Sequence, residues 1–233
     1  RLGVDVSCIA QVEEPTTLFL EMRTSEGASL QTYRTADYLM SIRQFPYSRF
    51  EQTSLFYTTC FALSKSPAQA VILEAAEKAH RAGVQLSLDV NYSEKIWPER
   101  REAQRVVAEY CRMGGLIKIS DSDFLNLYGE EKSAPEAVLE HFLKMGASEI
   151  CYTLGAKGSW VSDGKAQHFV EARPVEMKDP IGAGDAFWAG YLTASLDGKP
   201  LANRAMAGAR LAEMKISNFG PLPDQIDRAI LYS

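Results

Sequence analysis

The chain has little of what marks several large classes of protein. Its 233 residues include four cysteines and three histidines, and the sequence holds no Cys-x-x-Cys pair and no apolar run that is long enough to span a membrane. Basic residues form no prominent run and the net charge is −5, so the sequence does not predict a basic surface that would bind nucleic acid or an anionic membrane. These absences argue against disulfide-stapled, transmembrane and nucleic-acid-binding proteins. The first residues do not resemble a signal peptide, and we expect a cytoplasmic protein with buried free thiols.

What the chain does contain is typical of one soluble α/β domain. Apolar residues make up 46% and charged residues 24% of the sequence, which is enough for a sizeable core. Strand-like segments alternate with helical ones, and this alternation predicts right-handed crossovers and a mainly parallel sheet between two layers of helices. The strands are expected at 53–59, 84–90, 116–120 and 149–154, and the helices at 67–81, 98–113, 135–145 and 202–214.

The first part of the chain predicts smaller β elements. Residues 17–23 and 30–34 are β-rich and are separated by a turn at 26–28, so a hairpin is expected. Residues 4–9 are expected to form a short connecting strand.

Residues 179–187, Asp-Pro-Ile-Gly-Ala-Gly-Asp-Ala-Phe, carry the clearest chemical signal. Gly182 and Gly184 permit a tight turn and leave backbone N–H groups open to an anion. The small apolar run at 186–196 predicts a helix, whose N-terminus adds the positive end of its dipole. Asp185 lies inside this anion hole, where a carboxylate can take a proton from an attacking hydroxyl. The stretch therefore predicts phosphoryl transfer, and the alternative is an ordinary glycine turn before a helix.

Polar residues gather where three predicted strands end. Because ligands bind beyond the carboxyl ends of parallel strands, the repetition favours a binding site. Each group also has a structural interpretation, as turn residues or as an N-cap for the next helix. The groups are Asp89 and Asn91; Lys118, Ser120 and Asp123; and Thr153, Gly155, Lys157 and Gly158.

The string at 179–187, followed by Gly190, resembles the C-terminal signature of the ribokinase-like, PfkB-type carbohydrate kinases, and the other motifs are closest in style to fructokinases. The resemblance extends from about residue 1 to residue 230. It implies a ribokinase-like fold and an ATP-dependent, magnesium-dependent kinase that phosphorylates a sugar. It also implies that Asp185 is the catalytic base and that the backbone of Gly182, Ala183 and Gly184 cradles the transferring phosphoryl group.

Further roles follow from the same resemblance. The implied nucleotide-binding residues are Thr153, Gly155, Gly158, Asn218 and Gly220; the implied substrate residues are Tyr33, Arg34, Asp89 and Asn91; the implied magnesium residues, acting through water, are Ser120 and Asp123; and backbone oxygens of Asp179 and Ile181 are implied to hold a potassium ion. Arg34 also reads as an exposed cation on a solvated strand, and the loop at 218–221 as a plain cap of the last helix.

The chain departs from the family pattern in three places. Ser93 stands where an Arg is common after Asp-x-Asn, and Ser120 and Asp123 replace an Asn and a Glu. The family's first strands have no counterpart ahead of Arg1, so we expect residues 1–233 to form a single kinase domain without those strands, with remnants of a β lid within 14–36. Since relatives often pair through lid strands, a homodimer stays open as an alternative to a monomer.

The predicted function is ATP-dependent phosphorylation of a sugar hydroxyl, with a neutral hexose such as fructose as the favoured substrate. A 2-keto-3-deoxygluconate-type sugar acid is the second choice. Its carboxylate would require two cationic side chains, and one of them is missing because Ser93 stands where an Arg is common. A nucleoside is the third. From another class comes a non-catalytic nucleotide- or sugar-binding regulator on the same scaffold.

Overall fold

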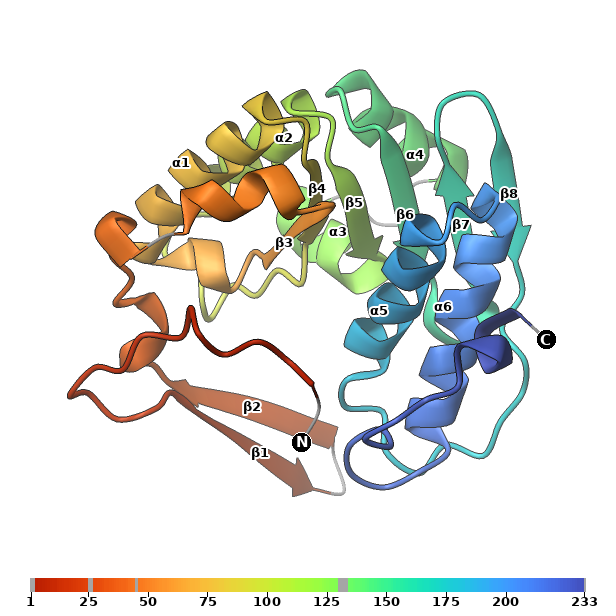
Figure 1. Cartoon of the computed structure of the whole chain (residues 1–233). Helices are drawn as coiled ribbons and strands as arrows, with labels where there is room; N and C mark the ends of the chain where they lie inside the picture. Colours follow the sequence, from red (N-terminus) through yellow and green to blue (C-terminus); the bar gives the residue numbers. More distant parts are fainter. Residues whose placement is uncertain (1–2, 25–26, 45, 130–133, 233) are drawn as a thin grey trace.

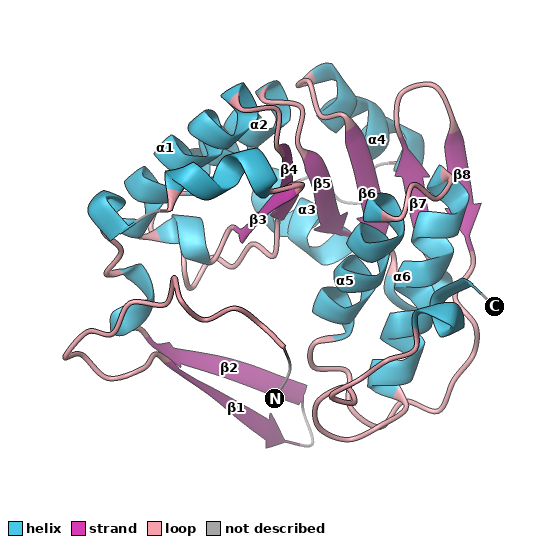
Figure 2. Ribbon diagram, in the orientation of Figure 1, coloured by secondary structure: helices cyan, strands magenta, loops and turns pink. Residues whose placement is uncertain are grey.

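The computed structural model describes residues 3–24, 27–44, 46–129 and 134–232, and within them the chain forms a sheet layered between helices, with a separate β hairpin beside it (Figures 1 and 2). The sheet has six strands in the order β3-β4-β5-β6-β7-β8. Strands β3 to β6 pair in parallel, and β7 and β8 continue the sheet antiparallel. The sheet strands are β3 (Leu55–Thr59), β4 (Gln85–Asp89), β5 (Leu116–Ser120), β6 (Glu149–Thr153), β7 (Ser159–Ser162) and β8 (Gln167–Val170).

Helices cover both faces of the sheet, and each face has its own apolar core. On one face, alternate residues such as Leu88, Ile117 and Ile119 pack against α1 (Ala68–Arg81), α2 (Arg100–Arg112) and α4 (Pro135–Lys144). On the other face, Leu116 and Cys151 pack against α5 (Ala183–Leu196). Because strand side chains alternate between faces, polar residues that share a face with Leu116 point toward α5.

Helix α5 lies against α6 (Leu201–Ile216) at close range. A Cβ at Gly190 would come within 2.5 Å of the carbonyl oxygen of Ala207, and one at Gly208 within 2.8 Å of that of Phe187. No side chain fits at either position, so these glycines let the two helix backbones approach. This contact fixes the direction of α5 and therefore the place of its first turn.

The hairpin of β1 (Leu18–Thr24) and β2 (Gly27–Tyr33) is a two-stranded antiparallel sheet of its own. It lies beyond the end of the main sheet at which β3 to β6 finish, and it falls within the range expected for the lid (Figure 1). Of the turn expected at 26–28, residue 26 lies outside the described residues, and the prediction was wrong for Gly27 and Ala28, which belong to β2 and pair with β1. Short α3 (Asp121–Tyr128) follows β5 directly.

The predicted three-layer α/β/α class is confirmed, and the strands and helices expected from 53 to 154 are present within a few residues of their expected bounds. One strand prediction was wrong, and two strands were missed. Residues 4–9 form no strand, and Val4, Val6 and Ile9 are exposed instead. The four-residue strands β7 and β8 went unpredicted because segments that short carry little periodicity.

All four thiols are free. Cys60, Cys111 and Cys151 are buried as expected, whereas Cys8 is exposed. Burial raises the pKa of Cys111 to about 12. Among the described residues, no helix combines the length and apolar character needed to cross a bilayer.

Candidate active site

The first turn of α5 presents unpaired backbone amides. Gly182 precedes the helix with φ of 77°, a left-handed conformation that favours glycine, and the first helical hydrogen bond runs from the N–H of Ala186 to the carbonyl oxygen of Gly182 at 2.9 Å. The N–H groups of Gly184 and Asp185 have no acceptor among the described residues. Two donors and the positive end of the helix dipole therefore converge where the sequence predicts an anion hole.

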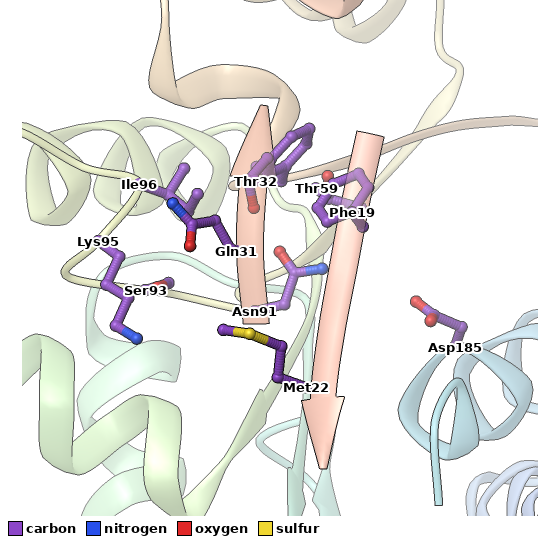
Figure 3. A pocket seen from close by; sticks show the side chains of 11 residues that line it. Phe19, Met22, Gln31, Thr32, Thr59, Asn91, Ser93, Lys95, Ile96 and Asp185 are labelled. Carbon is purple, nitrogen blue, oxygen red and sulfur yellow. The ribbon is translucent and has the colours of Figure 1, made fainter. Parts of the chain in front are cut away.

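Asp185 is the third residue of α5, and its exposed side chain lines a cavity of about 940 Å³. Figure 3 shows the carboxylate on one side of this cavity and Gln31, Ser93 and Lys95 toward the other. The remaining lining residues come from the hairpin and from the ends of β3 and β4: Phe19, Met22, Thr32, Thr59, Phe61, Asn91 and Ile96. A carboxylate next to a helix N-terminus thus opens onto a space that is large enough for a small ligand.

A buried ion pair lies beside this helix start. The register of β4 and β5 places Asp89 opposite Lys118, and the ammonium Nζ contacts both carboxylate oxygens at 2.9 and 2.8 Å. Both residues are almost fully buried, at 1% and 4% exposure. A Cβ on Gly184 would lie 3.2 Å from Lys118 Nζ, so the cation sits close to the first turn of α5. Glycine at 184 therefore leaves room for a lysine as well as for an anion.

Negative charge is concentrated in the same neighbourhood. Burial raises the pKa of Asp89, Lys118 opposes this shift, and the carboxylates of Asp123 and Asp185 raise the pKa further. Burial likewise raises the pKa of Tyr57, with further contributions from Asp89 and Asp185. The carboxylates of Asp89, Asp123 and Asp185 therefore lie near enough to one another for each charge to influence this region.

Ser120 and Asp123, the residues predicted for magnesium, form the N-terminal cap of α3. The Asp123 N–H donates to Ser120 Oγ at 3.0 Å, and Ser120 Oγ donates to Asp123 Oδ2 at 2.6 Å. Within the described ranges, no three His, Cys, Asp or Glu side chains gather as they would around a protein-bound metal. A magnesium ion that is bound to a nucleotide takes most of its ligands from phosphate and water. The single oriented carboxylate of Asp123 fits such an ion.

Three of the five residues predicted for the nucleotide lie farther along the same edge, and the other two follow α6. Thr153 is the register partner of Ser120 across β5 and β6, and Gly155 begins a short 3₁₀ helix just beyond it. Gly158 has a packing reason as well, since a Cβ there would lie 2.2 Å from the carbonyl oxygen of Val170. Asn218 donates from Nδ2 to the carbonyl oxygen of Met214, so it caps α6, and Gly220 has φ of 79° in the following loop. Their nucleotide role stays a prediction.

The four residues predicted for the substrate separate in space. Asn91 lines the cavity, whereas Asp89 is buried against Lys118. Arg34 does not line it: its guanidinium donates to Asp37 Oδ2 through Nε at 2.9 Å and stacks over Phe61, with 4.3 Å to the ring centroid. Tyr33 is also outside the lining. From the same strand Gln31 and Thr32 reach the cavity instead.

One of the two residues predicted for potassium, Asp179, already contacts a cation. Lys215 Nζ donates to Asp179 Oδ2 at 3.0 Å and to the backbone oxygen of Asp179 at 3.3 Å. That backbone oxygen is one of the two ligands expected for the metal ion. The arrangement of Asp179 and Ile181 therefore does not fit a potassium ion, because an ammonium group takes up the expected position.

Sequence reasoning assigned no role to three lysines. Lys118 was noted only as a strand-end residue, and Lys95 and Lys215 went unnoticed. A signal existed for two of them: Lys118 interrupts the buried strand Leu116–Ser120, and Lys215 lies in the last turn of a helix built of small residues. A buried lysine in such a segment needs a nearby carboxylate.

Comparisons with known proteins place the chain in a family. The model of the pfkB family carbohydrate kinases matches residues 1–227. The ATP-dependent 6-phosphofructokinase of Thermoanaerobacterium thermosaccharolyticum is 25% identical over 224 residues, covering 96% of this chain and 69% of the relative. The 2-dehydro-3-deoxygluconokinase of Bacillus subtilis is 25% identical over 228 residues, covering 94% and 69%.

Solved structures agree on the fold. A fructokinase double mutant from Vibrio cholerae O395, solved with fructose, ADP and a potassium ion, superimposes with a TM-score of 0.81 at 22% identity, covering 95% of this chain and 73% of that one. The predicted enzyme class, an ATP-dependent carbohydrate kinase, is confirmed at the level of the family, and the substrate stays a prediction. With a family model that spans nearly the whole sequence and the signature loop at the start of α5, this chain belongs to the pfkB family of carbohydrate kinases.

Proposed function

We propose that this protein transfers the γ-phosphoryl group of ATP to a hydroxyl group of a small sugar, with Asp185 as the general base. The observation that carries the proposal is the position of Asp185, which lies in the first turn of α5 beside amides without acceptors among the described residues and faces the cavity. A base next to an anion site is what phosphoryl transfer to an alcohol requires.

In the proposed reaction, the carboxylate of Asp185 accepts the proton of the sugar hydroxyl, and the hydroxyl oxygen attacks the γ-phosphorus of ATP. The new oxygen–phosphorus bond forms as the bond to the bridging oxygen of ATP breaks, and ADP leaves. Charge on the phosphoryl oxygens in transit is stabilised by the amide of Gly184 at the helix start, whereas the N–H of Ala183, also implied by the resemblance, donates to the carbonyl oxygen of Pro180 at 3.1 Å. Lys118 adds a fixed positive charge, because Asp89 holds its ammonium group beneath Gly184.

ATP and magnesium complete the proposed site. Thr153, Gly155, Gly158, Asn218 and Gly220 would hold the nucleotide, and Ser120 and Asp123 would orient water molecules around the metal ion. When bound, magnesium neutralises phosphate charge. The implied potassium ion is a different matter, because Lys215 contacts Asp179 where that ion would bind.

For the substrate we favour a neutral hexose such as fructose. The cavity offers amide and hydroxyl groups from Gln31, Thr32, Thr59 and Asn91, which suit the hydroxyl groups of a sugar. One observation favours the sugar-acid alternative. Lys95 lines the cavity and forms no ion pair with any described residue, so its ammonium group is available for a carboxylate. A nucleoside stays the third choice, and a non-catalytic regulator is disfavoured by the position of Asp185.

A homodimer through the lid is a further proposal, together with a cytoplasmic location where ATP is available. The hairpin exposes Leu18 and Leu20, which do not line the cavity, and an exposed apolar two-stranded sheet favours association with another sheet. Light scattering after size exclusion would distinguish the dimer from a monomer.

The activity test is sugar-dependent ADP release in the presence of ATP and magnesium, measured on a panel of fructose, 2-keto-3-deoxygluconate, fructose 6-phosphate and adenosine. The product is identified by mass spectrometry. We expect one panel member to give a product that carries one additional phosphoryl group, with ADP in equal amount. Binding of ATP and sugar without any phosphorylated product would support the regulator instead.

A further inference from the structure

A second buried lysine, Lys215, contacts the loop that leads into α5. Lys215 is 8% exposed and Asp179 is 9% exposed. The Lys215 ammonium contacts the carboxylate and the backbone oxygen of Asp179. The N–H of Ile181 donates to the other carboxylate oxygen of Asp179 at 3.2 Å. Asp179 is thus fixed between the last turn of α6 and the loop whose end forms the anion site.

Two further contacts fasten the same junction. The N–H groups of Lys178 and Asp179 donate to the carbonyl oxygen of Ile216 at 2.7 and 3.2 Å. A Cβ at Gly182 would lie 3.7 Å from Lys215 Cε, so the lysine side chain runs directly beneath the residue that caps α5. Any displacement of Lys215 would therefore reach Gly182, and with it the amides of the first turn of α5.

Charge explains why a lysine suits this place. It lies at the C-terminus of α6, where the negative end of the helix dipole favours a cation, and its ammonium group donates to oxygens that a metal ion would otherwise coordinate. A potassium ion at the same oxygens would meet a buried like charge within a few ångströms, and that repulsion opposes its binding.

We propose that Lys215 is a built-in monovalent cation that replaces the potassium ion expected at Asp179 and Ile181, and that phosphoryl transfer by this protein is independent of potassium. The proposal rests on the proposed function for its kinetic part only. Lys215 is a positioning residue: it is not among the residues that line the cavity, and it acts through Asp179 and Gly182.

The first experiment uses the wild-type protein in potassium chloride, sodium chloride and choline chloride at equal ionic strength. We expect the same melting temperature in all three salts and ADP release rates that agree within about twofold, since a site that is already filled gains nothing from added ligand. A melting temperature raised by potassium alone, or activity stimulated at least about tenfold by potassium, would overturn the proposal. The melting temperature needs no activity, so it decides even if no sugar on the panel is phosphorylated.

The second experiment uses Lys215→Ala and Lys215→Arg, with the exposed Lys144→Ala as a matched control. Lys215→Ala should melt at a lower temperature in choline chloride and recover in part in potassium chloride, because the vacated oxygens can then coordinate the ion. Lys215→Arg keeps a cation and should stay indifferent to potassium, as should the control. A Lys215→Ala protein that melts equally low in both salts would contradict the proposal. If that variant does not fold, a Lys215→Arg protein that responds to potassium would contradict it equally.

Discussion

Two buried lysine–aspartate pairs lie close to the start of α5, and they differ in the groups that their ammonium ions contact. The Lys118–Asp89 pair joins two neighbouring strands, and both ammonium contacts go to carboxylate oxygens. The Lys215–Asp179 pair joins a helix to a loop, and one of its contacts goes to a backbone oxygen. The first pair therefore fixes a charge at the end of the sheet, and the second fixes the path of the chain.

The difference separates chemistry from positioning within one small region. Lys118 comes close to Gly184, where the transferring phosphoryl group is proposed to pass, so its charge acts on the reaction. Lys215 comes close to Gly182, so its contacts act on the shape of the turn. Changes at the two lysines should therefore affect different measurements. The Lys215 variants described above test the positioning role, and four predictions test the chemistry at the site.

The largest effect is expected for Asp185→Asn. An amide cannot accept the hydroxyl proton, so kcat should fall by about 10²–10⁴, the usual contribution of a general base. Binding of ATP, measured by isothermal titration calorimetry, should change little. Asp227→Asn, an exposed carboxylate far along the chain, serves as the control and should retain full activity. Near-normal turnover by Asp185→Asn would show that Asp185 is not the general base.

A large loss of stability is expected for Lys118→Met. Removing the ammonium group leaves the Asp89 carboxylate buried and unpaired, which costs about 3–5 kcal/mol in the free energy of unfolding, measured with urea. The double variant Asp89→Leu/Lys118→Met removes both charges and should recover most of that stability. If Lys118 also acts on the phosphoryl group, the recovered protein should still lose about 10²–10³ in kcat. A stable and fully active double variant would reduce the pair to a structural role.

Gly184→Ala should have an intermediate effect on turnover. The added methyl group would lie 3.2 Å from Lys118 Nζ and would push the ammonium group aside by a few tenths of an ångström. We expect kcat to fall about tenfold because positioning at a reacting centre is sensitive to such shifts. Gly83→Ala, which strains a left-handed residue with open space around it, should cost about 1 kcal/mol of stability and leave kcat unchanged. Equal kinetics for both variants would argue that Lys118 does not need its observed position.

The smallest effect is expected for Lys95→Met, and the size of the change in KM distinguishes the two leading substrate classes. A neutral hexose needs no cation at this position, so KM for fructose should change by less than about threefold, as for an exposed charge. KM for a sugar acid should instead rise by at least about tenfold if its carboxylate pairs with Lys95. The exposed Lys144→Met provides the baseline for both substrates. A tenfold rise with the sugar acid would favour the alternative substrate.

The sequence predicted the parts of the site that lie close together along the chain. Gly182, Gly184 and Asp185 occupy adjacent positions, so their turn, helix start and base follow from local rules. The two ion pairs did not follow, since their partners are 29 and 36 residues apart and meet only through strand register and the packing of α6. Arg34 was a candidate because of its place in the sequence, but Asp37, three residues later, engages its guanidinium. This ion pair depends on the directions of the two side chains, which the spacing of residues along the sequence does not predict.

The account depends most on Asp185 and Lys118 acting on one and the same phosphoryl group. A kinetic cycle tests this directly, with kcat measured for Asp185→Asn, for Asp89→Leu/Lys118→Met, and for the protein that combines all three substitutions. Residues that act as a unit are strongly non-additive, so the combined protein should be about as slow as the slower of its two parents. If the two losses simply multiply, the carboxylate and the ammonium group work independently and the proposed site is wrong.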